Sequence, residues 1–201
     1  MEDPIDDLLD VLDLTELGPS SFNGQSSGHG DYGLFGGHQL AQAIIGACKS
    51  VADERLLHSI HAFFLRGGDG HADIRYDVQS VREGRAFCQR RVTGIQQEKQ
   101  IIDLTASFHL PEQGPTEIIP EAPRGNEPPS GLPTFEECIE EVGPIFGEEW
   151  SQGLRPVEYR IEHAPWSPSG PSPQGGINSV SYTHLRAHET VLDLVCRLLL
   201  E

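Results

Sequence analysis

The sequence is poor in cysteine, in basic side chains and in long apolar runs. Its 4 cysteines are spread through 201 residues without a Cys-x-x-Cys pair, so the chain matches neither a zinc framework nor the disulfide pattern of a small secreted domain. Reduced thiols in a cytosol-like compartment are the simplest interpretation. No apolar stretch approaches the ~18 residues of a membrane-spanning helix, and the acidic start, MEDPIDD, lacks the apolar segment of a signal peptide. These absences predict a cytoplasmic protein that does not bind a membrane.

Basic residues are too few to balance the acidic ones. The 14 Lys and Arg residues face 31 Asp and Glu residues, which gives a formal net charge of -17. An acidic surface repels a phosphate backbone, so nucleic-acid binding is not expected. Apolar residues make up 37% of the chain, and its 22 glycines and 15 prolines indicate long loops beside a packed domain.

The segment Tyr32–Ala52, YGLFGGHQLAQAIIGACKSVA, has the clearest pattern. Apolar residues recur at three- and four-residue steps, which predicts a helix with one apolar face and polar residues such as Gln39 and Gln42 on the other. Gly36 and Gly37 allow a tight turn or the close approach of another group. The free N–H groups of a first helical turn stabilise a carbonyl oxygen or a phosphate. A plain turn before a core helix explains the same residues, so both interpretations stand.

Four segments after this helix have the composition of strands. Leu56–Arg66 is apolar on both faces, which predicts a central strand. Its two histidines are three residues apart and would lie on opposite faces of a strand, which argues against a shared metal ion. The other three segments are joined by short turns and form an antiparallel meander: Ala72–Val81, Ala86–Gln96 and Gln100–Leu110. A long helix wrapped by such a curved sheet is an α+β layout.

The flanking regions carry weaker patterns. Asp3–Leu14 predicts a short acidic helix, and Leu17–Gly24 predicts a loop that enters a short strand. Residues 111–133 are rich in Pro, Glu and Gly, which is typical of a linker. Arg155–His163 has the alternation of one further strand.

Two C-terminal segments have helical patterns of different origin. Thr134–Trp150 predicts a helix in which Thr134 is the N-cap and Glu137 completes a capping box. The run Ser181–Glu201, SYTHLRAHETVLDLVCRLLLE, resembles a translated adapter sequence. On that interpretation the natural sequence is cut short near residue 178, and the residues that follow carry no evolved function.

Few polar residues suggest chemistry by themselves. His58 is either an acid, base or orienting donor, or a buried histidine with satisfied hydrogen bonds. Arg66 either pairs with Asp69 across a Gly-Gly turn, which is the favoured interpretation, or meets an anionic ligand. Four arginines surround the predicted hairpin turn and fit either a solvated strand edge or a phosphate-bearing cofactor: Arg82, Arg85, Arg90 and Arg91. We expect no metal site and no cofactor.

Several blocks together resemble the thioesterase II (TesB-like) family of acyl-CoA thioesterases. The resemblance runs in order over roughly residues 5 to 163. The blocks are LFGGHQLAQAI (34–44), ERLLHSIHAFFLRGGD (54–69), YDVQSVREGRAFCQRRVTGIQ (76–96), IIDLTASFH (101–109) and RPVEYR (155–160). The resemblance implies a double hotdog, in which a long helix wrapped by a curved antiparallel sheet occurs twice, and this chain holds the first repeat.

The resemblance also implies the chemistry. Acyl-CoA is hydrolysed to free fatty acid and coenzyme A by a water that an Asp, a Thr or Ser, and a Gln hold. Those residues lie mainly in the second repeat, so no position of this chain is assigned to them. His58 matches a histidine of the family's HSxH block and is the catalytic candidate. Gly36, Gly37 and His38 match the loop before the hotdog helix, and with Arg66 they are the substrate-binding candidates.

The predicted organisation follows from these segments. We expect an N-terminal hotdog domain over 1–110, a linker with a helix over 111–154, the first strand of a second hotdog over 155–178, and an artefactual tail over 179–201. The expected partner is the acyl-CoA substrate, together with a homo-oligomer formed through sheet edges. Two other functions stay open: a hydratase or dehydratase acting on enoyl-thioesters, and a non-catalytic hotdog module. A peroxisomal location also stays open.

Overall fold

The structure is a computed structural model. It describes residues 4–26, 33–114, 131–134, 137, 158–163, 166–167, 170–171 and 177–181. The chain divides into two compact units, one that includes Met1–Gly114 and one over Pro115–His188. Each unit is described by itself.

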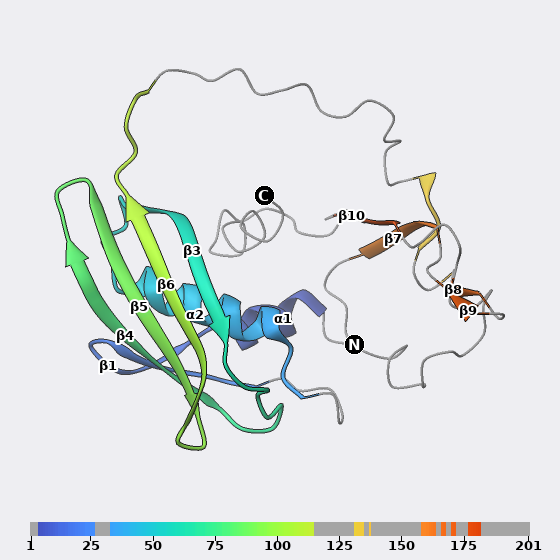
Figure 1. Cartoon of the computed structure of the whole chain (residues 1–201), viewed down its shortest axis with the longest axis horizontal. Coiled ribbons are helices and arrows are strands. Elements are labelled where there is room, and N and C mark those ends of the chain that lie inside the picture. The colour runs from blue at the N-terminus through green and yellow to red at the C-terminus, as the bar shows by residue number, and fades with distance from the viewer. Residues whose placement is uncertain are drawn as a thin grey trace. The chain divides into compact units, whose positions relative to one another are not determined.

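The first unit is a six-stranded antiparallel sheet curled around one long helix (Figure 1). The strand order is β1-β2-β4-β5-β6-β3. The elements are α1 (Pro4–Leu12), β1 (Thr15–Gly18), β2 (Ser21–Gly24), α2 (Gly36–Lys49), β3 (Leu56–Phe64), β4 (Ile74–Glu83), β5 (Phe87–Gln96) and β6 (Lys99–His109). The predicted α+β hotdog layout is therefore confirmed.

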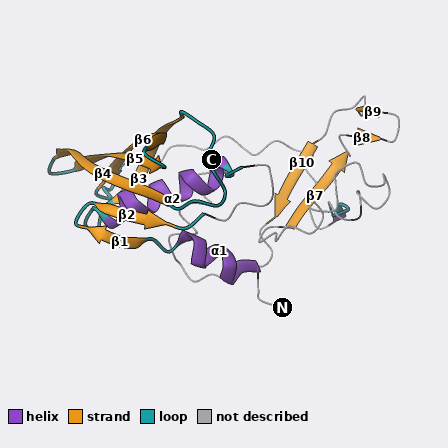
Figure 2. Cartoon of the chain, turned by 90° about the horizontal axis from the view of Figure 1, so that it is seen from below, coloured by secondary structure: helices purple, strands orange, loops and turns teal. Residues whose placement is uncertain are grey.

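Helix α2 forms the centre of the core. Its residues 41 to 47 are all buried, because the sheet bends around it, with β1 and β2 on one side and β4 to β6 on the other (Figure 2). Small side chains at Ala41, Ala43, Gly46 and Ala47 let the strands approach the helix closely. The largest fully buried side chains that pack around it come from α2, β4 and β6: Tyr76, Phe108, Ile44, Ile74, Ile102 and Leu104.

The meander has the predicted register signals. In β4, Ile74, Tyr76 and Val78 are buried while the residues between them are more exposed. Strand β5 pairs with β4 and with β6 in antiparallel fashion. The β5–β6 turn uses Gln97 at φ 50 and Glu98 at φ 60, the left-handed pair that a two-residue hairpin turn requires.

The N-terminal hairpin and strand β3 differ from what the sequence predicts. Leu17–Gly24 contains the end of β1, a tight turn and strand β2, so the expected short strand is present and the expected loop is the turn of a hairpin. The segment Leu56–Arg66 forms the edge strand β3 and not a central one. Its apolar residues are largely exposed, with Phe63 at 59% and Phe64 at 54%. An apolar composition on both faces therefore does not identify a central strand here, because β3 is an edge strand and its apolar side chains stay exposed in this unit.

A β-bulge also changes which residues of β3 share a face. The pairing with β6 shifts between Leu57 and Ser59, so His58 is the extra residue. Ser59 and His61 then lie opposite Ser107 and Thr105. The expectation that the two histidines lie on opposite faces is therefore wrong, because it assumed an unbroken alternation.

The second unit is described in its strands and in one turn. Strand β7 (Glu158–His163) pairs with β10 (Ile177–Ser181), and β8 (Trp166–Ser167) pairs with β9 (Gly170–Pro171). The strand predicted at 155–163 is thus confirmed over β7. The pairing of β10 runs across the predicted boundary near residue 178.

The predicted capping box is present. The Thr134 N–H donates to Glu137 Oε2 at 2.7 Å, and the Glu137 N–H donates to Thr134 Oγ1 at 3.2 Å. The remainder of the helix expected over 134–150 lies outside the described residues, as do most of the linker and residues 182–201 of the tail.

Candidate functional site

The glycine-led start of α2 is an open helix end. Phe35 is the N-cap, in an extended conformation and without a side-chain cap. Its carbonyl oxygen accepts from the N–H groups of His38 at 3.1 Å and Gln39 at 3.4 Å. The N–H groups of Gly36 and Gly37 precede the first helical bonds, and no acceptor for them occurs within the described ranges. This end can therefore receive an acceptor from outside.

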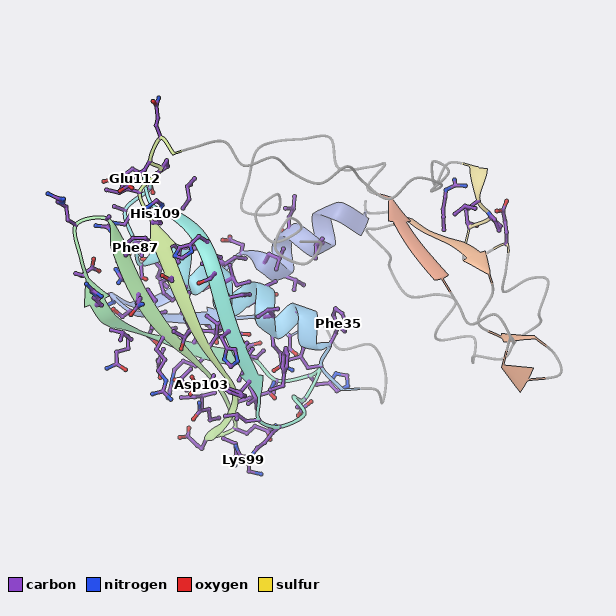
Figure 3. The ribbon with its side chains drawn as sticks, turned by 45° about the horizontal axis from the view of Figure 1, so that its top comes forward. Phe35, Phe87, Lys99, Asp103, His109 and Glu112 are labelled. Atoms are coloured by element: carbon purple, nitrogen blue, oxygen red, sulfur yellow. The ribbon has the colours of Figure 1, made fainter. Side chains whose placement is uncertain are left out.

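Two phenyl rings flank these glycines. A Cβ at Gly36 would lie 3.3 Å from the Phe64 ring, and a Cβ at Gly37 would collide with the Phe35 ring. Phe35 is 78% exposed and lies at the start of α2 (Figure 3). The glycines thus leave room for the two rings as they stand, and the helix end combines backbone donors with apolar walls.

His38 is fixed by its surroundings. Its Nε2 lies 2.9 Å from the carbonyl oxygen of Gln25. Because a carbonyl can only accept, Nε2 carries the hydrogen in the neutral ring. Burial lowers the pKa of His38, and hydrogen bonds to Gln25 and Gln42 oppose that shift. His38 therefore holds the helix to the chain after β2 as a neutral donor.

A buried polar network is centred on Gln42, which the local sequence pattern does not reveal. Gln42 Nε2 donates to the carbonyl of Val11 at 2.6 Å and to that of Gln25 at 2.9 Å. Gln42 Oε1 accepts from the Tyr76 hydroxyl at 3.0 Å. Burial raises the pKa of Tyr76, so the hydroxyl stays a donor. One side chain thereby joins α1, α2 and β4.

The expected polar face of this helix is therefore wrong for two residues. Gln39 and Gln42 are both buried. The signal that could have revealed this is the run of small residues on every side of Gln42, because a helix wrapped closely all round buries its polar positions as well. Gln39 Oε1 is buried and has no partner within the described residues.

His58 lies on the outer face of the sheet, the face away from α2. Its Nε2 is 2.9 Å from Ser107 Oγ, and its ring packs edge-on against Phe87 at 5.6 Å and His109 at 6.1 Å between centroids. The neighbours of Ser107 along β6, Ala106 and Phe108, are the ones that are buried. His58 thus belongs to an aromatic cluster on the surface.

The structure does not bring the candidate residues together. His58 is six residues before Phe64 along β3, a separation of about 20 Å at the rise of an extended strand. Phe64 lies beside Gly36, and His58 is on the opposite face of the sheet. A single small reacting group cannot contact both His58 and the glycine-led helix end.

Arg66 follows β3 near the helix end but does not form the expected pair. Its Nη1 donates to the Gln100 carbonyl at 2.6 Å, and no ion pair joins it to Asp69 within the described part of the chain. The backbone of Asp69 is held by Gln96, which accepts from the Asp69 N–H and donates to the Asp69 carbonyl, both at 2.7 Å. A buried glutamine therefore fixes this loop in place of the predicted ion pair.

The four arginines near the hairpin divide into two kinds. Arg90 is buried, pairs with Glu83, and donates to Ser50 Oγ at 3.0 Å and to the Ser50 carbonyl at 3.1 Å, which ties the C-terminal end of α2 to the hairpin. Arg91 is exposed and pairs with Asp103 at 2.5 Å. Its hydrogen bond is the main reason why the pKa of Asp103 is lowered.

The other two arginines, Arg82 and Arg85, are exposed. Neither forms a side-chain hydrogen bond or an ion pair to any residue that the structure describes.

Other site types find no support in the described residues. No group of three or more His, Cys, Asp or Glu side chains in these ranges could hold a metal ion. Among the described helices, none is long and apolar enough to cross a membrane. Cys48 and Cys88 are free thiols, and burial raises the pKa of Cys48 to about 11.

Comparison with known proteins shows what the N-terminal part of the chain resembles. Residues 25–109 match the family model described as the acyl-CoA thioesterase N-terminal domain. The N-terminal part of this chain is similar to acyl-CoA thioesterases. The matched range begins at Gln25 and ends with β6, so it contains α2, the glycine-led helix end and the four long strands β3 to β6.

Individual relatives agree with this assignment. The chain is 40% identical over 114 residues to acyl-CoA thioesterase 2 of Haemophilus influenzae, which covers 57% of this chain and 40% of that protein. It is 31% identical over 167 residues to acyl-coenzyme A thioesterase 8 of Homo sapiens, covering 79% of this chain and 51% of that protein. The chain thus spans about half the length, or less, of these curated thioesterase relatives.

A solved structure is similar as well. The tesB protein MAP1729c of Mycobacterium avium subs paratuberculosis superposes with a TM-score of 0.66 at 28% identity, covering 97% of this chain and 68% of that one.

Proposed function

We propose that this chain is part of an enzyme that hydrolyses acyl-CoA. Water adds to the thioester carbonyl, the carbon–sulfur bond breaks, and the products are a fatty acid and the free thiol of coenzyme A. The observation that carries the proposal is the family match over residues 25–109, which coincides with the helix-in-sheet domain. The open, glycine-led start of α2 supports it further.

Within this domain the start of α2 is the proposed wall of the acyl-CoA site. The N–H groups of Gly36 and Gly37 are suited to a carbonyl oxygen, because a first helical turn carries partial positive charge. The rings of Phe35 and Phe64 beside them suit an apolar acyl chain. His38 holds the turn in place through the Gln25 carbonyl.

Arg66 is the proposed contact for an anionic part of the substrate. Only its Nη1 has a partner in the described ranges, the Gln100 carbonyl, so the rest of the guanidinium is free to bind a phosphate.

The water-activating residues are proposed to lie outside this chain. The family resemblance assigns the Asp, the Thr or Ser, and the Gln mainly to a second hotdog repeat. The chain covers 40% and 51% of two curated relatives, a share that fits one repeat. Thr105 and Ser107 lie on the outer face of β6 and are poor substitutes for that set. We therefore expect the chain alone to be nearly inactive.

A thiol-release assay tests the proposal. A panel of acyl-CoA substrates of increasing chain length is incubated with this chain and with a version extended by its natural C-terminal sequence. We expect release of coenzyme A only from the extended protein. No release from a folded extended protein with any acyl chain would refute the proposed activity, and full activity of this chain alone would refute the division between repeats.

The hydratase or dehydratase alternative is less well supported. It requires His58 as the base beside the bound thioester, and His58 faces away from α2 against Phe87 and Ser107. Loss of the enoyl absorbance in the extended protein, abolished by His58→Ala, would favour this alternative over hydrolysis.

The edge of β3 is proposed as the place where a second hotdog pairs. β3 is an end strand of the sheet, and Leu56, Phe63 and Phe64 beside this edge are more than half exposed. Unpaired backbone groups and apolar side chains together favour association. Sedimentation velocity of the wild type and of Phe63→Glu would test this, since a monomeric wild type contradicts it.

A cytoplasmic location is also proposed, and imaging of the tagged full-length protein would test that location.

A further inference from the structure

The β4–β5 turn carries arginine side chains that the fold does not use. Arg90 and Arg91 are neutralised by Glu83 and Asp103. Arg82 and Arg85 flank the turn, are exposed, and have no side-chain partner among the described residues. The chain has a formal charge of -17, yet this turn carries two exposed arginines that no described acidic residue neutralises.

A third arginine reaches the same turn from another element. Arg55 Nη2 donates to the carbonyl of Gly84 at 2.9 Å and to that of Arg85 at 3.5 Å. Its Nη1 is buried and has no acceptor within the described ranges. Asp53 and Glu54 precede it, and neither forms an ion pair with it there. Arg55 therefore fixes the backbone of the turn between Arg82 and Arg85 and adds a third positive charge to it.

Aromatic rings adjoin these charges. Phe87, two residues after Arg85, is 45% exposed. Its ring lies 4.5 Å from the His109 ring at 38° and 5.6 Å from the His58 ring at 71°. Figure 3 shows Phe87 and His109 together at the end of the sheet where the β4–β5 turn lies. Their Cα atoms are paired in the β5–β6 register.

Exposed guanidinium groups on a turn that Arg55 holds, beside an exposed aromatic ring, match one ligand chemistry. Arginine binds phosphate oxygens through paired N–H groups, and an exposed ring stacks on a nucleobase. We propose that the turn at Arg82–Arg85, with Arg55 and the Phe87 cluster, binds a phosphate-bearing nucleotide. This site is about a strand's length from the glycine-led helix end and does not depend on hydrolysis at that end. Coenzyme A and a free adenine nucleotide share this chemistry.

Calorimetry of ligand binding to this chain, at one near-physiological salt concentration, tests the proposal. The probes are coenzyme A, dephospho-coenzyme A, ADP and pyrophosphate. We expect saturable binding of at least one nucleotide, weakened about tenfold or more by Arg82→Ala/Arg85→Ala, which is roughly 1.4 kcal/mol or more. The matched control is Arg75→Ala, which also removes an exposed arginine, one paired with Asp77.

The probes and a second variant separate the outcomes. Phe87→Leu should weaken nucleotide binding and leave pyrophosphate binding unchanged, because it removes only the stacking surface. If coenzyme A binds more tightly than dephospho-coenzyme A and ADP, the ligand of this site is coenzyme A. If ADP binds more tightly than coenzyme A, the ligand is a free nucleotide. Absence of saturable binding of every nucleotide, or equal weakening by Arg75→Ala, overturns the proposal. Unchanged circular dichroism and melting of each variant show that the fold is intact.

Discussion

The two faces of the sheet use the same residue types in opposite ways. Arg90 and Arg91 are neighbours in β5, yet Arg90 is buried on the α2 side and Arg91 is exposed on the outer side. The buried one joins two elements by several hydrogen bonds, and the exposed one makes a single surface ion pair. Position in the pleat, and not residue type, therefore decides whether a polar side chain holds the fold or is available to a ligand.

The largest loss of stability is expected at Gln42, the centre of the buried polar network. Gln42→Leu keeps the approximate volume but removes three hydrogen bonds. The Val11 carbonyl loses its side-chain donor, the Gln25 carbonyl keeps only His38, and the Tyr76 hydroxyl keeps only the Gln39 carbonyl at 3.4 Å. Each lost hydrogen bond costs on the order of 1 kcal/mol, so the unfolding free energy should fall by about 3 kcal/mol. Urea denaturation measures it. Tyr76→Phe is the matched control and should cost roughly one third as much; equal losses would contradict a shared network.

Arg90 and Arg91 provide a direct pair. Arg90→Met should lower the unfolding free energy by about 2 kcal/mol, because it removes the link between the C-terminal end of α2 and the hairpin. Arg91→Met should have a much smaller effect, since its ion pair with Asp103 is exposed to solvent. Thermal melts of both variants at one salt concentration make the comparison. Equal shifts in Tm would show that burial is not what distinguishes them.

Gly94 and its neighbour Thr93 compare how tightly the inner and outer faces of β5 are packed. It lies on the inner face of β5, where a Cβ would be 2.5 Å from Ile102 and 3.1 Å from the Tyr76 ring. Gly94→Ala should therefore destabilise by about 1–3 kcal/mol through overpacking. Thr93→Ala, the adjacent outer-face position, should cost less. If Gly94→Ala left the unfolding free energy unchanged, the inner face would have space for a methyl group, contrary to these distances.

His38, at the start of α2, contributes a pH dependence. Burial lowers its folded-state pKa below the ordinary value of about 6.5. The unfolded chain therefore takes up the proton first, so stability is fully present above about pH 6.5 and is lost as pH falls toward the folded pKa. His38→Gln keeps a donor for the Gln25 carbonyl and should flatten this part of the curve. An unchanged slope between pH 7 and pH 5 would rule out His38 as its source.

The smallest effect is expected on the outer face at acid pH. The Arg91 guanidinium holds the pKa of Asp103 below its ordinary value of about 4. Its stabilisation is present above that value and is lost as pH falls through the folded pKa. Asp103→Asn should remove this loss, and high salt should reduce it in the wild type. Stability curves from pH 6 to pH 2 at two salt concentrations test both points.

Local periodicity was sufficient for most of the fold. The apolar spacing in Tyr32–Ala52 predicted α2, and the alternation after Ala72 predicted β4, β5 and β6 with their turns. The capping box at Thr134 and the strand β7 were predicted in the same way. These features depend on side-chain spacing within one segment, so the sequence alone determined them. The quoted sequence blocks also carried the resemblance to acyl-CoA thioesterases.

Tertiary structure decided the roles of the polar residues. One bulge at His58 reversed the faces of β3, and the edge position of that strand could not be read from its apolar composition. The curl of the sheet buried Gln42 and Arg90, which have the same local patterns as exposed residues. The arginines near Glu83 were one cluster in the sequence, and pairing across strands divided them into structural ones and free ones. Burial depends on contacts between segments far apart in the chain, and local patterns contain no record of those contacts.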